Sequence, residues 1–118
     1  MNIHSSSIID PGAELGAGVS VGPFSIIGPH VQIGQKTVIG SHALIEANTV
    51  IGEGCKIFHG ASIGGEPQIM GFEDVSSSVE IGDGTVIREY ATIHRSSYKD
   101  GVTRIGKNCL LMAYFHVG

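Results

Sequence analysis

Two histidines near the end of the sequence are the side chains best suited to chemistry. His94 lies in a Thr-Ile-His-Arg-Ser segment, and His116 follows two aromatic residues. An imidazole titrates near neutral pH, so it can accept a proton from a hydroxyl group or bind a metal ion. A zinc site would need a third histidine, and none follows Ile81 at a plausible spacing. We expect the other four to be surface residues, namely His4, His30, His42 and His59.

The other reactive groups favour structural roles. Cys55 and Cys109 stand where Ser, Thr and Ala occur elsewhere in a repeat, so we expect small buried thiols and no disulfide. Arg88 and Glu89 are predicted to form a surface or intersubunit ion pair. The Gly64–Gly65 pair is too short a signal for a phosphate-binding loop.

A strict period of six positions these side chains. Nineteen of the twenty positions from Ile3 to Val117 in steps of six are Ile, Leu or Val, and the exception is Lys99. Neither a helix nor an ordinary strand has this period, whereas hexapeptide β-helices do. The sequence therefore predicts an all-β, left-handed parallel β-helix of about five to six coils. In it, three hexads form one coil, and each aliphatic side chain stacks on the aliphatic side chain three hexads later.

Two further positions of the hexad support this fold. A glycine follows the aliphatic residue at ten sites, where we expect a backbone conformation that glycine adopts most easily. Four residues after each of the first ten aliphatic residues, the side chain is small or β-branched, as a narrow interior requires. These slim residues are Ser7, Ala13, Val19, Ser25, Val31, Thr37, Ala43, Thr49, Cys55 and Ala61.

The repeat is interrupted twice. The glycine is missing after Ile69 and Val75, so Gly65–Glu80 is predicted to leave the coil as a loop of roughly two hexads. Lys99 cannot stay buried without a partner, so about Ser97–Arg104 is predicted to form a second excursion. Because the repeat continues to residue 118, we expect 1–118 to be an incomplete β-helix domain from a longer protein.

Composition excludes several classes of function. The formal net charge is −4 and no block of basic residues occurs, which argues against nucleic-acid binding. No run of eighteen apolar residues and no signal-peptide pattern is present, so we expect neither a membrane span nor secretion. Eighteen glycines and no tryptophan fit a thin aliphatic core.

Three segments taken together resemble one enzyme family. They are Ala61–Gln68, Glu80–Arg95 and Leu110–Gly118. In this order and spacing they are similar to the acyl-[acyl-carrier-protein]–UDP-N-acetylglucosamine O-acyltransferases of lipid A biosynthesis, across the whole chain. The resemblance implies a cytoplasmic homotrimer with active sites between subunits. It implies transfer of a 3-hydroxyacyl group from acyl carrier protein to the 3-hydroxyl of the sugar nucleotide, without metal or cofactor.

The resemblance also assigns site residues. It implies substrate-binding roles for Gln68, His94 and His116. The family's general base is the second histidine of a His-x-x-His-Asp motif whose first histidine matches His116, so the base falls one residue past Gly118. No catalytic residue is therefore expected within the chain, and residues 1–118 alone are expected to be inactive.

Two features leave alternatives open. Relatives usually carry Asp and Lys where this chain has Ile69 and Gly71, which puts the usual acceptor sugar in doubt. The same fold also serves as a non-catalytic trimeric scaffold and, less consistently with these histidines, as a zinc carbonic anhydrase.

Overall fold

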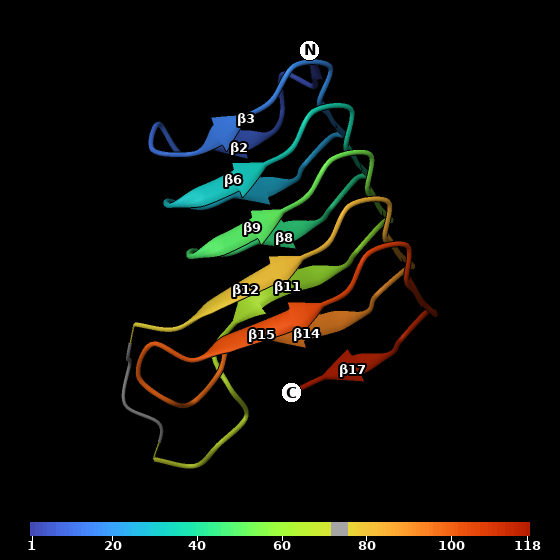
Figure 1. Ribbon diagram of the computed structural model, residues 1–118. Helices are drawn as coiled ribbons and strands as arrows, with labels where there is room; N and C mark the ends of the chain where they lie inside the picture. The colour runs from blue at the N-terminus through green and yellow to red at the C-terminus, as the bar shows by residue number, and fades with distance from the viewer. Residues whose placement is uncertain (72–75) are drawn as a thin grey trace.

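The computed structural model describes residues 1–71 and 76–118, whose strands form three parallel sheets (Figure 1). The first sheet contains β1 (Asn2–Ile3), β4 (Ser20–Val21), β7 (Val38–Ile39), β10 (Lys56–Ile57), β13 (Val86–Ile87) and β16 (Leu110–Leu111). The second contains β2 (Ile8–Ile9), β5 (Ile26–Ile27), β8 (Leu44–Ile45), β11 (Ser62–Gly65), β14 (Thr92–His94) and β17 (His116–Val117). The third contains β3 (Glu14–Leu15), β6 (Val31–Ile33), β9 (Thr49–Ile51), β12 (Ser78–Ile81) and β15 (Val102–Ile105).

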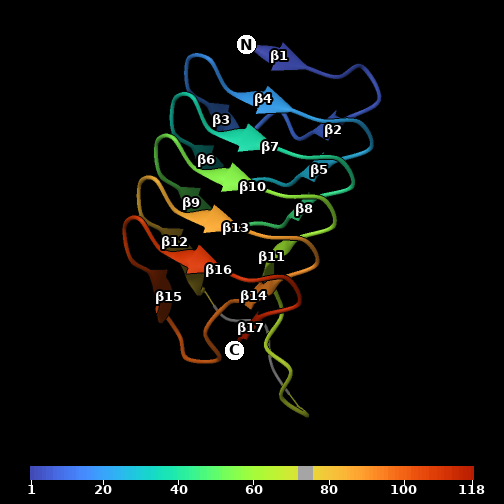
Figure 2. The same cartoon turned by 90° about the vertical axis from the view of Figure 1, so that its right-hand side faces the viewer.

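The chain visits the three sheets in turn, so that successive coils stack along one axis (Figure 2). Every third strand pairs in parallel, which is the predicted arrangement of a hexapeptide β-helix. The described residues contain no helix that could cross a membrane.

Aliphatic side chains of the repeat form the core. In the second sheet Ile27 pairs with Ile45, and Ile45 with Ile63, at the predicted step of three hexads. All three are buried, and removal of their surface from water is the main stabilising contribution of each coil. The aliphatic residues of the first coil are more exposed, because only one neighbouring coil covers them.

Hydroxyl groups at the slim position connect the coils. Thr37 Oγ1 donates to the Gly52 carbonyl at 2.8 Å and accepts from the Cys55 N–H at 3.1 Å. Thr85 Oγ1 repeats this pattern with Gly106 and Cys109 further along the coil. A buried hydroxyl with both partners satisfies backbone groups that would otherwise be unpaired at the corner. The slim position thus selects for small size and for hydrogen bonding.

The two excursions are present, with different boundaries from those predicted. The pairing step rises from three hexads to five between Ile51 and Ile81 and to four between Ile81 and Ile105, so the excursions add two hexads and one hexad. Gly65 belongs to β11, and Ser78–Glu80 belongs to β12, so the first loop is shorter than Gly65–Glu80. Val75, one of the aliphatic positions of the six-residue repeat, lies outside the described residues.

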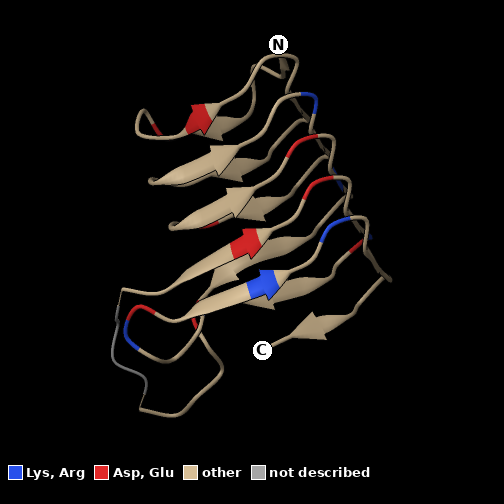
Figure 3. Ribbon diagram, viewed as in Figure 1, with Lys and Arg blue, Asp and Glu red and all other residues tan. Residues whose placement is uncertain are grey.

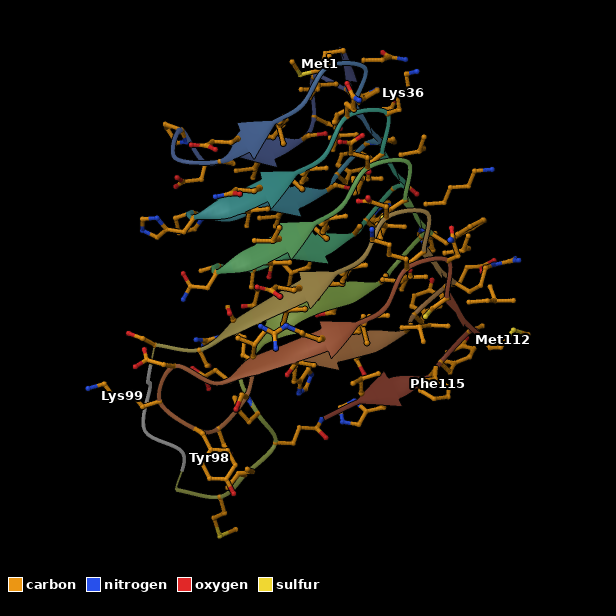
Figure 4. All side chains as sticks on the ribbon, in the orientation of Figure 1. Met1, Lys36, Tyr98, Lys99, Met112 and Phe115 are labelled. Carbon is orange, nitrogen blue, oxygen red and sulfur yellow. The ribbon has the colours of Figure 1, made fainter. Side chains whose placement is uncertain are left out.

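The second excursion is also shorter than predicted. Val102–Arg104 pairs with β12 as part of β15, and the Arg104 guanidinium lies 2.8 Å from the Glu80 carboxylate across these strands (Figure 3). Pairing with β12 satisfies the backbone N–H and C=O groups of Val102–Arg104. The hexad pattern alone did not predict this pairing. Lys99 is exposed on the excursion beside Tyr98, as its charge required (Figure 4).

The expected role of the repeat glycines was wrong. Among the ten glycines that follow an aliphatic residue, only Gly64 has a positive φ. The left-handed conformation occurs instead three residues after the aliphatic residue, as at Phe24 (φ 60°) and His42 (φ 53°). The repeat glycines make room for the next coil, because a Cβ at Gly34 would lie 2.6 Å from the Gly52 carbonyl carbon.

Candidate functional site

The coil brings His94 and His116 together. His94 ends β14, and His116 begins β17, the neighbouring strand of the second sheet. Their ring centroids are 5.0 Å apart and the ring planes meet at 83°, so one ring edge faces the other ring. Two predicted site residues separated by one coil in sequence therefore form one imidazole pair.

Thr92 supports the second ring of this pair. It is the strand partner of His116, and its Oγ1 lies 2.7 Å from His116 Nδ1. A hydroxyl group can donate to a bare nitrogen or accept from an N–H, so this contact suits either protonation state of Nδ1. His116 Nε2 lies on the open side, where a Cβ on Gly118 would be 3.0 Å away.

A bulge in β11 creates the space beside His94. The register shifts between Ile63 and Gly65, which places Gly65 next to His94 in the ladder. A Cβ on Gly65 would lie 3.0 Å from Glu46 Oε2 and 3.6 Å from His94 Nε2. Because Gly65 has no side chain, a carboxylate and an imidazole can approach each other over its backbone.

Arg95 holds this bulge in place. Its backbone N–H donates to the Gly65 carbonyl at 2.8 Å, and its Nε donates to the Gly64 carbonyl at 3.1 Å. The Arg95 side chain is almost entirely buried, so these bonds form away from bulk solvent. The Gly64–Gly65 pair, which was not expected to bind phosphate, acts here as a fixed support for the histidine site.

The two rings have different electrostatic surroundings. Burial lowers the pKa of His94, the positive charge of His116 lowers it further, and the Glu46 carboxylate opposes both effects. His94 Nδ1 is buried and has no hydrogen-bond partner among the described residues. His94 is therefore held as a neutral imidazole more firmly than an ordinary histidine.

Such a pair can bind and orient oxygen-containing ligands. Nδ1 is buried in His94 and contacts the Thr92 hydroxyl in His116, so Nε2 is the nitrogen that each ring has left for a ligand. Nε2 can exchange hydrogen bonds with hydroxyl, carbonyl or phosphate oxygens. Among the described residues, no three His, Cys, Asp or Glu side chains are grouped closely enough to hold a metal ion.

The structure does not place Gln68 with the histidine pair. It is exposed in the longer excursion, and no described contact joins it to either ring. Sequence reasoning missed Thr92 and Glu46 as parts of the site. Thr92 could have been found from the spacing. A coil normally contains three hexads, and the second excursion adds one, so the residue four hexads before His116 is its strand partner.

Two of the histidines expected at the surface, His42 and His59, also belong to a ladder of rings. Phe24, His42, His59, Tyr90 and Tyr114 follow one corner of the coil, with successive centroids 5.2, 5.2, 5.2 and 5.5 Å apart. His59 Nδ1 lies 2.8 Å from the hydroxyl oxygen of Ser41 in the preceding coil, and its Nε2 lies 2.8 Å from the Tyr90 hydroxyl. His42 is exposed and His59 half-buried. The ladder was not foreseen because these residues are spaced by the coil, and not by any motif.

The two cysteines and the Arg88–Glu89 pair lie elsewhere on the coil. Cys55 is a buried free thiol, as predicted, whereas the free thiol of Cys109 is only partly buried. Arg88 Nε lies 2.8 Å from Glu89 Oε1, and its guanidinium covers the Phe58 ring at 4.3 Å. This pair forms within the chain and is half-exposed.

Comparison with known proteins connects this geometry to a family. No protein-family model matches the chain. An acyl-[acyl-carrier-protein]–UDP-N-acetylglucosamine O-acyltransferase of Sulfurihydrogenibium sp. is 61% identical over 118 residues, covering 99% of this chain and 44% of that protein. Over its whole length, the chain is homologous to this acyltransferase family. The relatives that it matches are a little more than twice its length.

Solved acyltransferase structures agree with the coil. The UDP-N-acetylglucosamine O-acyltransferase of Moraxella catarrhalis matches with a TM-score of 0.96 at 43% identity, covering 100% of this chain and 46% of that one. The Francisella novicida UDP-N-acetylglucosamine acyltransferase matches with a TM-score of 0.93 at 42% identity, over 98% of this chain and 43% of that one. The predicted left-handed β-helix of the acyltransferase family is thereby confirmed.

Proposed function

We propose that the protein to which this chain belongs moves a 3-hydroxyacyl group from acyl carrier protein to the 3-hydroxyl of UDP-N-acetylglucosamine, the reaction that opens lipid A synthesis. The observation that carries the proposal is 55–61% identity, over 98–99% of the chain, to proteins named for this acyl transfer. The paired histidines on the outer face of the second sheet support it, since they can contact a hydroxylated, phosphorylated substrate.

The proposed chemistry requires a base. The sugar hydroxyl attacks the thioester carbonyl, a C–O bond forms, the C–S bond breaks, and the hydroxyl proton ends on the departing thiol of acyl carrier protein. We assign the base to the position after Gly118, following the family motif. His94, His116 and Gln68 are proposed to bind substrate, and the reaction needs no metal or cofactor.

Self-association is part of the same proposal. We expect a cytoplasmic homotrimer in which neighbouring subunits complete each site. In the single chain, Ile8 and Ile26 remain largely exposed on the outer face of the second sheet, which also carries the histidines. A second copy covering this apolar row would remove it from water.

The test is an acyl-transfer assay with the whole protein, 3-hydroxyacyl-acyl carrier protein and UDP-N-acetylglucosamine. Formation of the sugar ester is expected, and His116→Ala should lower kcat/KM at least tenfold. His30→Ala, on a different corner, is the matched control and should leave the rate unchanged. An inactive but correctly folded trimer would favour the scaffold alternative. Transfer only to the 3-amino analogue of UDP-N-acetylglucosamine would show that the acceptor is the analogue. Ile69 and Gly71, which replace the usual Asp and Lys, would then explain the difference.

Residues 1–118 should be assayed beside the whole protein. We propose that they are the N-terminal part of the β-helix domain and are inactive alone. Loss of a general base typically costs about 10²–10⁴-fold in rate. Equal activity of both proteins would show that the base lies within residues 1–118.

A further inference from the structure

The buried nitrogen of His94 determines what the ring can do. Nδ1 of this ring is inaccessible to solvent and has no hydrogen-bond partner within residues 1–71 and 76–118. Nε2 is not among the buried unpartnered atoms of the described residues and makes no described bond, so it faces the open side of the site. The two nitrogens of one ring therefore have opposite environments.

A neutral imidazole carries its proton on one of the two nitrogens, and burial decides which. In native structures a buried N–H without an acceptor is rarer than a buried acceptor without a donor, a rule stated for backbone groups that we apply to the ring nitrogens. The more stable arrangement leaves Nδ1 bare and puts the proton on Nε2, where water or a ligand can accept it. Protonation of both nitrogens would place an N–H at the unpartnered position, and this agrees with the lowered pKa of His94.

We infer that His94 is a fixed hydrogen-bond donor: its single ring proton stays on Nε2 and is donated to an oxygen atom of the ligand, so the ring does not act as a base. That the ligand is a sugar nucleotide rests on the proposed function. The position of the proton does not, since it follows from the burial of Nδ1.

The surroundings of the ring are consistent with this role. Glu46, which directly follows β8, approaches across Gly65, and His116 approaches from β17. Glu46 favours a charged His94, whereas burial and a charged His116 oppose it, and the latter effects dominate. The Arg95 side chain points to the Gly64 carbonyl.

His116 differs from His94 in this respect. The Thr92 hydroxyl bonded to its Nδ1 can either donate or accept, so His116 can carry its proton on Nδ1, on Nε2 or on both. The pair thus combines one fixed donor with one ring whose hydroxyl partner can either donate or accept. This division separates the roles of two side chains that the sequence treats alike.

The direct test is long-range ¹H–¹⁵N correlation spectroscopy of the protein with ¹⁵N-labelled histidines. At neutral pH we expect His94 to show a protonated Nε2 and a bare Nδ1, with the same pattern in Thr92→Val. His116 should change its tautomer populations in Thr92→Val and remain unchanged in the control Thr103→Val. A proton on His94 Nδ1, or a charged His94 at neutral pH, would overturn the inference.

Two substitutions test the donor in ligand binding. A glutamine amide reaches about as far as Nε2, whereas an asparagine amide reaches about as far as Nδ1. Titration of the whole protein with UDP-N-acetylglucosamine should therefore show near-normal affinity for His94→Gln and up to about tenfold weaker binding for His94→Asn, the value of one hydrogen bond. The reverse order would contradict a donor at Nε2. If the unmodified protein does not bind this nucleotide, the proposed function fails, while the spectrum still decides the position of the proton.

Discussion

The hydroxyl oxygen of Thr92 lies 2.7 Å from Nδ1 of His116, its strand partner in the next coil. Residue pairing in parallel strands thus places a neutral hydroxyl directly behind a histidine on the outer surface of the sheet. Carboxylates commonly orient histidines and favour their charged form. A hydroxyl orients the ring without imposing either protonation state.

Replacing Thr92 by Val should therefore weaken the site while preserving the coil. The substitution keeps the branched shape but removes the hydrogen bond, which is worth about 0.5–1.5 kcal/mol. We expect kcat/KM for acyl transfer by the whole protein to fall about three- to tenfold, and Thr92→Ser to restore most of it. Unchanged activity in Thr92→Val would show that the ring is held by other contacts, chiefly its edge-to-face contact with His94.

Stability should depend on pH through His94. Its pKa in the folded protein lies below the ordinary value of 6.5, because burial disfavours the charged ring. As pH falls through about 6.5, the unfolded chain takes up a proton that the folded chain does not, so the free energy of unfolding decreases. The decrease stops once pH is below the pKa of the folded state.

His94→Gln removes this titration and should flatten the slope below pH 6.5. Denaturant unfolding at a series of pH values measures it. His4→Gln is the control, since His4 is exposed and its ring contacts the nearby Ser6. An identical slope in His94→Gln and in the unmodified protein would mean that the ring is not held neutral.

The period of six predicts the coil because every aliphatic residue in it must stack on another. It could not predict the ends of the excursions, because Ser78 and Val102 enter strands through backbone pairing with each other and not through their side chains. Similarly, His94 and His116 were recognised by type, whereas their partners Thr92 and Glu46 were missed. Those contacts depend on the coil step after an excursion and on the bulge at Gly65.

The ring ladder should contribute to stability through Tyr90, which contacts rings on both sides. Tyr90→Phe removes only the bond to His59 Nε2 and should cost about 1 kcal/mol, measured by urea unfolding. Tyr90→Leu also removes both ring contacts, at 5.2 and 5.5 Å, and should cost about 1–2 kcal/mol more. Tyr114→Leu removes one described ring contact and should cost less than Tyr90→Leu. Equal losses for the two leucine variants would argue against a continuous ladder.

The two cysteines should react at different rates. Burial raises the pKa of the Cys55 thiol, and the side chain is inaccessible, so the reactive thiolate is scarce. Cys109 is partly exposed at the last described coil. A thiol reagent added to residues 1–118 should modify Cys109 first, as peptide mass spectrometry would show. In the whole protein, protection of Cys109 would indicate that a further coil covers it, whereas rapid labelling of Cys55 in either form would contradict its place in the core.

Substitution of two glycines by alanine separates space from backbone strain. Gly34 has an ordinary φ, but a Cβ there would lie 2.6 Å from the Gly52 carbonyl carbon and the Glu53 nitrogen, which are backbone atoms that cannot move aside. Gly54 has a φ of 64°, with nothing within 4 Å of a Cβ. Alanine at Gly54 should cost about 1 kcal/mol, the usual penalty of a left-handed conformation. Alanine at Gly34 should cost about 3 kcal/mol, because the coils must separate locally. Urea unfolding of both variants decides the order. If Gly54→Ala were the more destabilising, the repeat glycines would be there for conformation, as the sequence alone had led us to expect.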